Sequence, residues 1–329
     1  MFGVDTGTAG YEYTNRNKYV LDYLLQSNAD IIGLQEVSSL NPGLSKADWF
    51  DTLNGNGGLT SAGYTCVKGL DVYTGREHSS SLTSEREKTM FNPIYFKTDK
   101  YKLIANDTIW FTDAESRDEA SRIDGANTDK ALNYVVLEVL DENGNGTGVR
   151  FMYVNLHLIV RSTNSGNLNA LDKNGNDTGH LVQELQVIYL REILDDLLAQ
   201  YDLPMFIGGD FNNSATTING WLTKSVVNDD GTINSSGKPT ETVKITRANP
   251  YATNVVTGCS TITEDFKNLG DYDKAADDKW GAIDLWFSAN FNGVMHAYVV
   301  DDNKVASTGK YPSDHLPTQF VVTLYTAKN

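Results

Sequence analysis

The sequence predicts an α/β protein in which two packed sheets are flanked by helices. Three observations support this prediction. Apolar runs of strand length are numerous, two longer segments have the apolar period of a helix, and helices and strands are mixed along the chain. The chain has 329 residues, of which 40% are hydrophobic, so it can bury a sizeable core. Because no Pro-rich or Ser-rich linker divides it, we expect one domain over residues 1–329.

Two segments, 17–26 and 181–198, are expected to form amphipathic helices because their apolar residues recur on one face. These residues are Val20, Leu21, Leu24 and Leu25 in the first segment, and include Leu185, Ile188, Leu194 and Leu197 in the second.

Apolar runs bounded by polar or turn-forming residues predict the strands. In chain order the runs are "IIGL", "FNPIYF", "TIWF", "LNYVVLEVL", "VRFMYVNLHLIV", "MFI", "GAIDLWFSANF", "MHAYVVDD" and "TQFVVTLY". The link "DENGNGTG" between the fourth and fifth runs is rich in Asn and Gly, which favours a hairpin. The same link matches the first half of a calcium-binding loop, but Met152 stands where the closing glutamate belongs, so we interpret the link as a turn.

Charge and cysteine content limit the function classes. Lys and Arg number 27 against 43 acids, and this net charge of −16 disfavours a broad basic face for duplex nucleic acid but not a local phosphate site. Cys66 and Cys259 are too few for a disulfide framework or a zinc cluster, and a disulfide between them stays open. No stretch has the length of a membrane span, and no signal peptide precedes Tyr11. The acidic, Asn/Thr/Gly-rich loops favour an exported bacterial protein.

Polar residues recur where apolar strands end. They are Glu36, Asn155, His157, Asp210, Asn212, Asp284, Asp314 and His315. A lone buried acid is usually an ion-pair or capping residue, but five strand ends with the same feature indicate one shared cleft. Phosphoester hydrolysis needs this residue set: carboxylates for a hard cation, a base for water, and donors for the phosphoryl oxygens.

The motifs "IIGLQE", "NPIYF", "VNLHL", "GGDFN", "IDLWF" and "SDHLP", in this order, closely resemble the endonuclease/exonuclease/phosphatase family, which includes deoxyribonuclease I-like nucleases and phosphatases. The match runs from about Asn17 to the C-terminus. The resemblance implies a four-layer α/β (α+β) sandwich of two packed, mainly antiparallel sheets flanked by helices. It places the site at the edge where the strand ends meet.

The resemblance also implies residue roles. Glu36 matches the family's metal-binding glutamate, and Asp314 an acid near the metal. The cofactor is then a divalent metal, Mg²⁺ by preference, with Mn²⁺ and Ca²⁺ as alternatives. Asp210 matches the aspartate that activates water or serves the leaving group, and Asn212 the asparagine that contacts phosphate.

The remaining matches concern the two histidines. His315 matches the histidine that acts as a base or binds the scissile phosphate, and Asp284 the acid that accepts its other ring N–H. His157 matches a second histidine of the nuclease and sphingomyelinase branches. Asn155 matches a supporting neighbour, with a strand-pairing or turn role as the alternative. The expected catalytic residues are therefore His157, Asp210, Asn212, Asp284 and His315, with Glu36 and Asp314 on the metal.

Two departures from the family pattern affect the site. Family members usually begin with a strand ending in an asparagine near the metal, and no such strand precedes Gly3. Many relatives have a glutamate three residues before the proline of "NPIYF", where it can support a site histidine. Met90 occupies that position here, so the setting of His157 is open.

We expect a metal-dependent phosphoesterase in which Asp210 or His315 prepares a water for attack on phosphorus. A small or lipid-like phosphomonoester or phosphodiester is favoured, because the net charge repels an extended polyanion. A deoxyribonuclease I-like endonuclease is the alternative, and a non-catalytic phosphate-binding module is a second one. Arg76, Arg86 and Lys88 supply only a modest positive loop. We expect a monomer without a transmembrane segment.

Overall fold

The structure is a computed structural model of the whole chain. It describes residues 13–38, 49–73, 89–112, 117, 123, 126, 129–160, 168–171, 174–224, 226–227, 233–234, 246–247, 254–256, 283–300 and 315–325.

The described helices and strands follow one another in a mixed order. They are α1 (Tyr13–Ser27), β1 (Ile31–Gly33), β2 (Val37–Ser38), α2 (Trp49–Asn54), β3 (Tyr64–Val67), β4 (Leu70–Tyr73), β5 (Thr89–Phe91), β6 (Ile94–Lys97), β7 (Tyr101–Trp110), β8 (Ala131–Leu140), β9 (Gly146–His157), β10 (Asn169–Leu171), β11 (Asp177–Leu181), α3 (Val182–Tyr201), β12 (Met205–Asp210), α4 (Ala215–Lys224), β13 (Val226–Val227), β14 (Ile233–Asn234), β15 (Thr246–Arg247), β16 (Asn254–Val256), β17 (Asp284–Ala289), β18 (Gly293–Val300) and β19 (Thr318–Leu324).

A six-stranded sheet in the order β15-β17-β12-β9-β8-β7 forms one inner layer. Its described pairings are antiparallel except that of β9 with β12, which is parallel. A parallel pair needs a crossover connection, and α3 lies in the chain between these two strands. The crossover brings the C-terminal ends of β9 and β12 to the same edge of the sheet.

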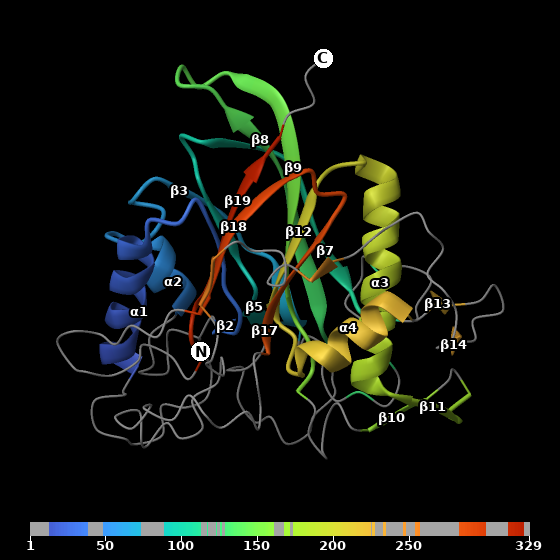
Figure 1. The fold of residues 1–329 in the computed structure, drawn as a ribbon. Helices are drawn as coiled ribbons and strands as arrows, with labels where there is room; N and C mark the ends of the chain where they lie inside the picture. Colours follow the sequence, from blue (N-terminus) through green and yellow to red (C-terminus); the bar gives the residue numbers. More distant parts are fainter. Residues whose placement is uncertain are drawn as a thin grey trace.

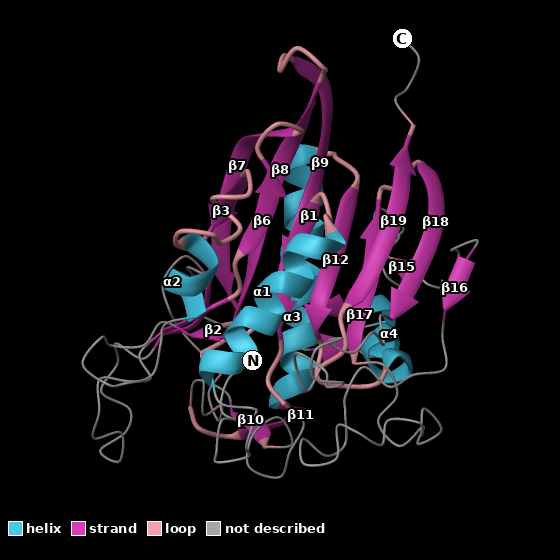
Figure 2. Ribbon diagram, turned by 90° about the vertical axis from the view of Figure 1, so that its left-hand side faces the viewer, coloured by secondary structure: helices cyan, strands magenta, loops and turns pink. Residues whose placement is uncertain are grey.

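The second inner layer consists of two three-stranded sheets, β1-β6-β3 and β16-β18-β19. Helices α1 and α2 lie outside this layer, and α3 and α4 lie on the opposite side of the molecule (Figure 1). The view along the perpendicular direction shows α1 in front of the strands and α3 behind them (Figure 2). The predicted four-layer α/β sandwich is therefore confirmed.

Three buried apolar clusters separate the four layers. Leu190 and Leu194 of α3 share one cluster with Val154 and Ile207 of the six-stranded sheet. A second cluster joins α1 to β1, β3, β5 and β6. Burial of these aliphatic side chains supplies most of the stabilisation of such a fold, at about 25 cal/mol per Å².

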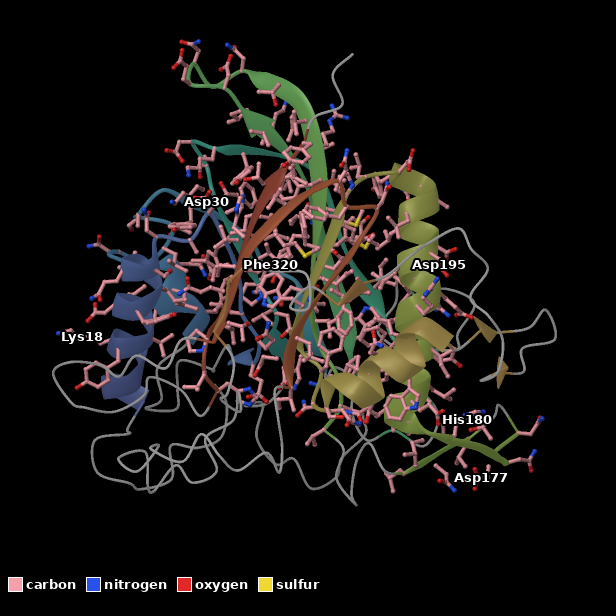
Figure 3. The ribbon with its side chains drawn as sticks, viewed as in Figure 1. Lys18, Asp30, Asp177, His180, Asp195 and Phe320 are labelled. Atoms are coloured by element: carbon pink, nitrogen blue, oxygen red, sulfur yellow. The ribbon has the colours of Figure 1, made fainter. Side chains whose placement is uncertain are left out.

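The third cluster fills the space between the two inner layers and is rich in aromatic rings. Phe320 of β19 lies in the middle of the molecule (Figure 3) and packs against Phe206 of β12 and Trp286 of β17, with ring centroids 6.0 and 5.5 Å apart. Tyr153 of β9 stacks on Trp286 at 5.7 Å. These contacts hold β19 over the six-stranded sheet.

Both predicted helices and the predicted hairpin are present. The segments 17–26 and 181–198 lie within α1 and α3, and β8 and β9 flank the Asn-Gly-rich link. The Asp141 carboxylate of this link accepts hydrogen bonds from the backbone N–H groups of Asn143 and Asn145, at 2.9 and 2.8 Å. The interpretation as a turn therefore holds.

Two strand predictions were wrong in extent. "FNPIYF" belongs to two strands, β5 and β6, because the chain leaves the first sheet at Asn92 and Pro93, and proline cannot donate to a strand ladder. "TIWF" supplies only the last residues of the ten-residue β7, which is an edge strand of its sheet and has polar residues in its middle. Among the described residues, no helix is both long and apolar enough to cross a membrane.

Gly209 lets β12 pass close to β9. Its φ is +148°, and a Cβ atom here would overlap the backbone carbonyl of Leu156. A side chain at this position would push β12 away from β9 immediately before Asp210. The second glycine of "GGDFN" is therefore required by the close approach of two backbones.

We predict that Gly209→Ala lowers the free energy of unfolding by about 2–4 kcal/mol, because the clash is with backbone. The matched control is Gly220→Ala in α4, where a Cβ meets no heavy atom within 4 Å. That variant should stabilise the protein by up to about 1 kcal/mol, since alanine favours the helix. Urea denaturation measures both. Equal effects of the two substitutions would contradict the steric role of Gly209.

Candidate functional site

Three neighbouring strands place three predicted site residues in one row. Asp210 pairs in register with His157 of β9 on one side and with Asp284 of β17 on the other. Residues aligned in this way on adjacent strands point to the same face of a sheet. The three side chains are more than 50 positions apart in the sequence and meet because of this register.

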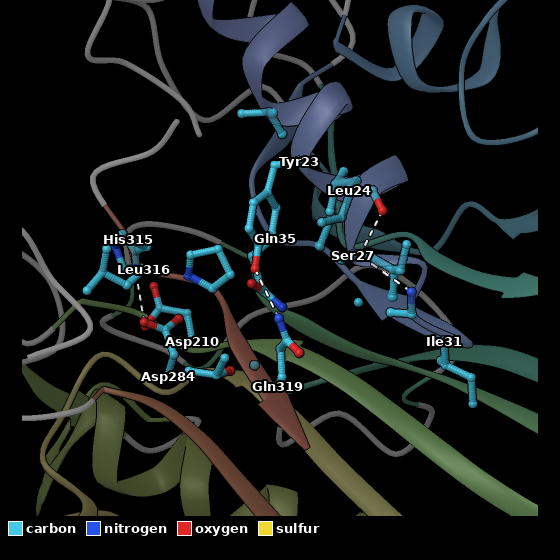
Figure 4. A pocket seen from close by; sticks show the side chains of 18 of the residues that line it. Tyr23, Leu24, Ser27, Ile31, Gln35, Asp210, Asp284, His315, Leu316 and Gln319 are labelled. Carbon is cyan, nitrogen blue, oxygen red and sulfur yellow. Dashed lines mark hydrogen bonds and ion pairs between the residues drawn. The ribbon is translucent and has the colours of Figure 1, made fainter. Parts of the chain in front are cut away.

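His315, two residues before the proline that precedes β19, completes the row. Its Nδ1 lies 3.0 Å from Oδ2 of Asp284, which is the orienting contact expected from the sequence. Ligand atoms of Asp210, Asp284 and His315 all lie within 4.8 Å of one another. The three side chains gather at one end of a cavity (Figure 4).

The Asp210 carboxyl group is buried at the centre of this row. Its Oδ1 accepts a hydrogen bond from the backbone N–H of Asn212 at 2.8 Å, and its Oδ2 lies 3.8 Å from Nε2 of His157. Burial and the negative charge of Asp284 raise the pKa of Asp210 to about 6, against the lowering effects of His315 and His157. Such a group is suited to accept a proton near neutral pH.

Asn212 shapes the turn that follows β12. It has a φ of +51°, a left-handed conformation that asparagine tolerates better than most residues. Its Nδ2 donates to the carbonyl oxygen of Leu158 at 2.9 Å, which ties the turn to the end of β9. In the structure Asn212 therefore orients Asp210, and its expected contact with phosphate stays a prediction.

Asn155 anchors the turn that carries Glu36. Its fully buried Nδ2 donates to the carbonyl oxygen of Leu34 at 2.9 Å and to that of Asn92 at 3.1 Å. Its Oδ1 accepts from Nε2 of Gln35 at 2.7 Å. Because Glu36 has a φ of +57°, which is unusual outside glycine, these bonds help to hold a strained residue in place. Asn155 thus supports the Glu36 turn, and its expected role as a supporting neighbour of His157 stays a prediction.

Lys130 is a site residue that the sequence reading missed. It precedes β8, is 5% exposed, and places its Nζ 2.9 Å from Nδ1 of His157. The position that the family pattern reserves for a supporting glutamate is Met90, and the structure gives His157 a lysine neighbour. The apolar run after Lys130 predicts a strand start, and nothing in the local pattern indicates that its ammonium turns towards a histidine 27 residues away.

The cavity of about 190 Å³ extends from this row between the two halves of the second layer. Its lining residues include Glu36, Tyr153 and Trp286. Asp210, Asp284 and His315 lie together at one end, and α1 covers the cavity (Figure 4). Consecutive residues of β1 (31–33) and β19 (318–319) line it. Successive residues of a strand point to opposite faces, so the strand edges themselves form these walls.

In the described part of the chain, β1 and β19 are edge strands of their sheets. Residues 1–12 lie outside the described residues, so the expectation about a first strand stays a prediction.

Several predictions fall on residues that the structure does not describe. Asp314, the second predicted metal ligand, is one of them, and so are Arg76, Arg86, Lys88 and Cys259. Cys66 of β3 is a free thiol whose pKa burial raises to about 11.

The donor set fits a divalent cation. Asp210 and Asp284 are buried next to each other, and Glu36 lines the same cavity. Buried carboxylates in proximity repel one another, and the pKa of Asp210 is raised first by burial and then by the negative charge of Asp284. Carboxylate oxygens are the ligands that Mg²⁺ prefers, so a hard cation would relieve this repulsion. Glu36, which lines the same cavity, is the residue that the sequence predicts to hold such a cation.

Comparisons with known proteins agree with the motif order. The model of the "Endonuclease/Exonuclease/phosphatase family" matches residues 8–315. A search of curated protein sequences found no significant match.

Similar solved structures come from bacteria and from human. A mannosyl-6-phosphatase of Bacteroides thetaiotaomicron is 17% identical, with a TM-score of 0.63 over 98% of this chain and 95% of that one. An endonuclease/exonuclease/phosphatase of Bacteroides vulgatus is 17% identical, with a TM-score of 0.62 over 95% and 92%. The human Nocturnin catalytic domain with bound sulfate is 16% identical, with a TM-score of 0.53 over 97% and 91%. At these identities the similarity demonstrates the fold.

We predict that Asp210→Asn stabilises the protein at neutral pH. The pKa of Asp210 is about 6 in the folded protein and 3.8 ordinarily, so folding disfavours its charged form. This unfavourable contribution is absent below the lower value, grows as pH rises between the two, and is complete above about 6. Thermal unfolding in chelator should show a gain of about 1–3 kcal/mol at pH 8 that disappears near pH 4. A gain that is independent of pH would contradict the argument.

Proposed function

The chain belongs to the endonuclease/exonuclease/phosphatase family, and from that premise we propose that it is a metal-dependent phosphoesterase that hydrolyses a small phosphoester. The observation that carries this proposal is the row of His157, Asp210 and Asp284 completed by His315. A water molecule, a phosphoryl group and a cation need acids, imidazoles and hydrogen-bond donors within a few ångströms of one another, and this row supplies them.

Asp210 is the group placed to accept a proton from the attacking water. It lies at the centre of the row, its orientation is held by the Asn212 N–H, and burial brings its pKa to about 6. His315 is held by the Asp284 carboxylate, which accepts the Nδ1 hydrogen and so fixes the orientation of the ring. His315 is therefore suited to bind a phosphoryl oxygen or to exchange a proton with the reacting groups.

A divalent cation, Mg²⁺ in our proposal, would neutralise phosphoryl charge and stabilise the leaving oxygen. Glu36 would hold it, with Asp314 as the predicted second ligand. The family generally uses a divalent metal, and the acidic cluster described above provides a suitable environment.

Charge favours a small substrate. The described residues that line the cavity include Glu36, Asp210 and Asp284 but neither lysine nor arginine. With a net charge of −16, long-range electrostatics oppose the approach of an extended polyanion. The similar structure of a mannosyl-6-phosphatase makes sugar phosphates a first class to test. A nuclease activity is the second candidate, because the family includes nucleases.

We predict that p-nitrophenyl phosphate or bis-p-nitrophenyl phosphate is hydrolysed in Mg²⁺ and that chelation abolishes the activity. Asp210→Asn and His315→Gln should each lower kcat about 10³-fold, because each removes a group used in the transition state. Asp195→Asn, on the surface of α3 (Figure 3), is the matched control and should leave kcat unchanged. Full activity in chelator, or in Asp210→Asn, would refute the proposal.

A panel of sugar phosphates, inositol phosphates and sphingomyelin, with plasmid nicking in parallel, separates the two candidates. Preference for a monoester over plasmid supports the small substrate, and efficient nicking supports a nuclease. Absence of hydrolysis across the panel, with metal bound, would favour the non-catalytic module.

We further predict that Asn155→Leu raises the Mg²⁺ concentration for half-maximal activity about tenfold, because the Glu36 turn loses its anchor. Asn133→Leu is the matched control. Asn133 is an equally buried cross-strand neighbour whose side chain contacts Leu70 and Thr108, away from the site. Both variants should lose about 1–3 kcal/mol of stability, but only the first should change the metal dependence. The same metal dependence in both would exclude this role.

A further inference from the structure

The two histidines of the site have opposite neighbours at the same ring nitrogen. Nδ1 of His315 faces a carboxylate oxygen of Asp284 at 3.0 Å. Nδ1 of His157 faces the ammonium of Lys130 at 2.9 Å, and both of these side chains are buried. An ionised carboxylate such as that of Asp284 can only accept hydrogen bonds, whereas the ammonium of Lys130 can only donate them.

The lysine neighbour determines which nitrogen of His157 carries the hydrogen. A lysine ammonium has three donors and no acceptor, so Nδ1 must offer its lone pair. The hydrogen of the neutral ring then lies on Nε2, and this nitrogen faces Oδ2 of Asp210 at 3.8 Å. A doubly protonated ring would place one positive donor against another in a buried place.

We propose that Lys130 is a positioning residue that holds His157 in its neutral Nε2–H form, so that His157 presents a hydrogen-bond donor to a phosphoryl oxygen beside Asp210. His315, held by Asp284, is the imidazole left for proton exchange. The kinetic part of this inference rests on the proposed function, whereas the statement about the ring nitrogens does not.

Lys130 could influence activity in two other ways, and the experiments must distinguish them from its effect on the His157 tautomer. Its positive charge also acts on the Glu36 carboxylate. A neutral lysine could instead accept a hydrogen from Nδ1, and Nε2 would then accept from a protonated Asp210. The first route bypasses His157. The second reverses the direction of the Lys130–His157 hydrogen bond and moves the proton to the Asp210 side of the Nε2–Oδ2 contact.

The tautomer is tested directly by long-range ¹H–¹⁵N correlation spectra of the full chain labelled with ¹⁵N-histidine. The chain has five histidines, and the spectrum of His157→Gln assigns the signals of His157. We expect the Nε2–H form alone between pH 6 and 8 in the wild-type protein and in Lys130→Arg, because arginine is also only a donor. Lys130→Met should give a mixture of the two tautomers. A wild-type ring protonated on Nδ1 would overturn the proposal.

Kinetics test whether Lys130 acts through His157. Lys130→Met should lower kcat about 10–100-fold, with KM changed much less. Lys130→Arg should keep most of the wild-type kcat. In the His157→Gln background, Lys130→Met should cost nothing more, because residues that act as a unit are not additive. Additive losses would show that Lys130 acts on Glu36 or on the substrate instead, and would refute the proposal.

Lys100→Met is the matched control, since Lys100 pairs with Asp30 on the surface and should leave kcat unchanged. Circular dichroism and thermal unfolding verify that each variant folds. Should Lys130→Met not fold, the wild-type and Lys130→Arg spectra still decide the tautomer. Should the protein hydrolyse no phosphoester, the same spectra decide the proposal while the proposed function fails.

Discussion

The site depends on the register of β12 between β9 and β17. In this register Asp210 lies beside His157 and opposite Asp284, and the Asp284 carboxylate in turn holds His315. A slip of one residue would turn every side chain of β12 to the other face of the sheet. The chain secures the register by tight contact, because Gly209 allows the backbone of β12 to touch Leu156 and the Trp286 ring covers Gly208.

Several local features of the site oppose stability. Asp210 is buried with a raised pKa, and Glu36 and Asn212 adopt left-handed backbone conformations. Strain and buried charge of this kind persist only where the surrounding structure determines them strongly. Here the surroundings are the Asn155 bonds to the Glu36 turn and the aromatic cluster between the sheets. The four-layer core therefore stabilises a site that would not hold its geometry alone.

The sequence predicted the residues of the site better than their partners. Glu36, Asp210 and Asp284 stand at the ends of apolar runs, and a strand end is visible in a local pattern. Lys130 and Gln35 were missed because their roles depend on contacts with residues far away in the sequence. Lys130 contacts a histidine 27 positions away, and Gln35 contacts an asparagine 120 positions away. The short β5 and β6 and the long, half-polar β7 were misjudged for a related reason. Pairing with neighbouring strands sets their limits, and the apolar content of the segment does not.

The arrangement of charge explains why a lysine beside a histidine suits this site. A phosphoryl group is an anion, and Glu36, Asp210 and Asp284 would repel it. Under the proposed function, positive charge would come from close by, from a cation bound by the acids and from hydrogen-bond donors of the protein. Lys130 is too deeply buried to reach far, but through Nδ1 of His157 its charge polarises an N–H that faces the row. The imidazole thus carries the effect of a buried ammonium to the place where a phosphoryl oxygen would bind, while the ammonium itself stays 5% exposed.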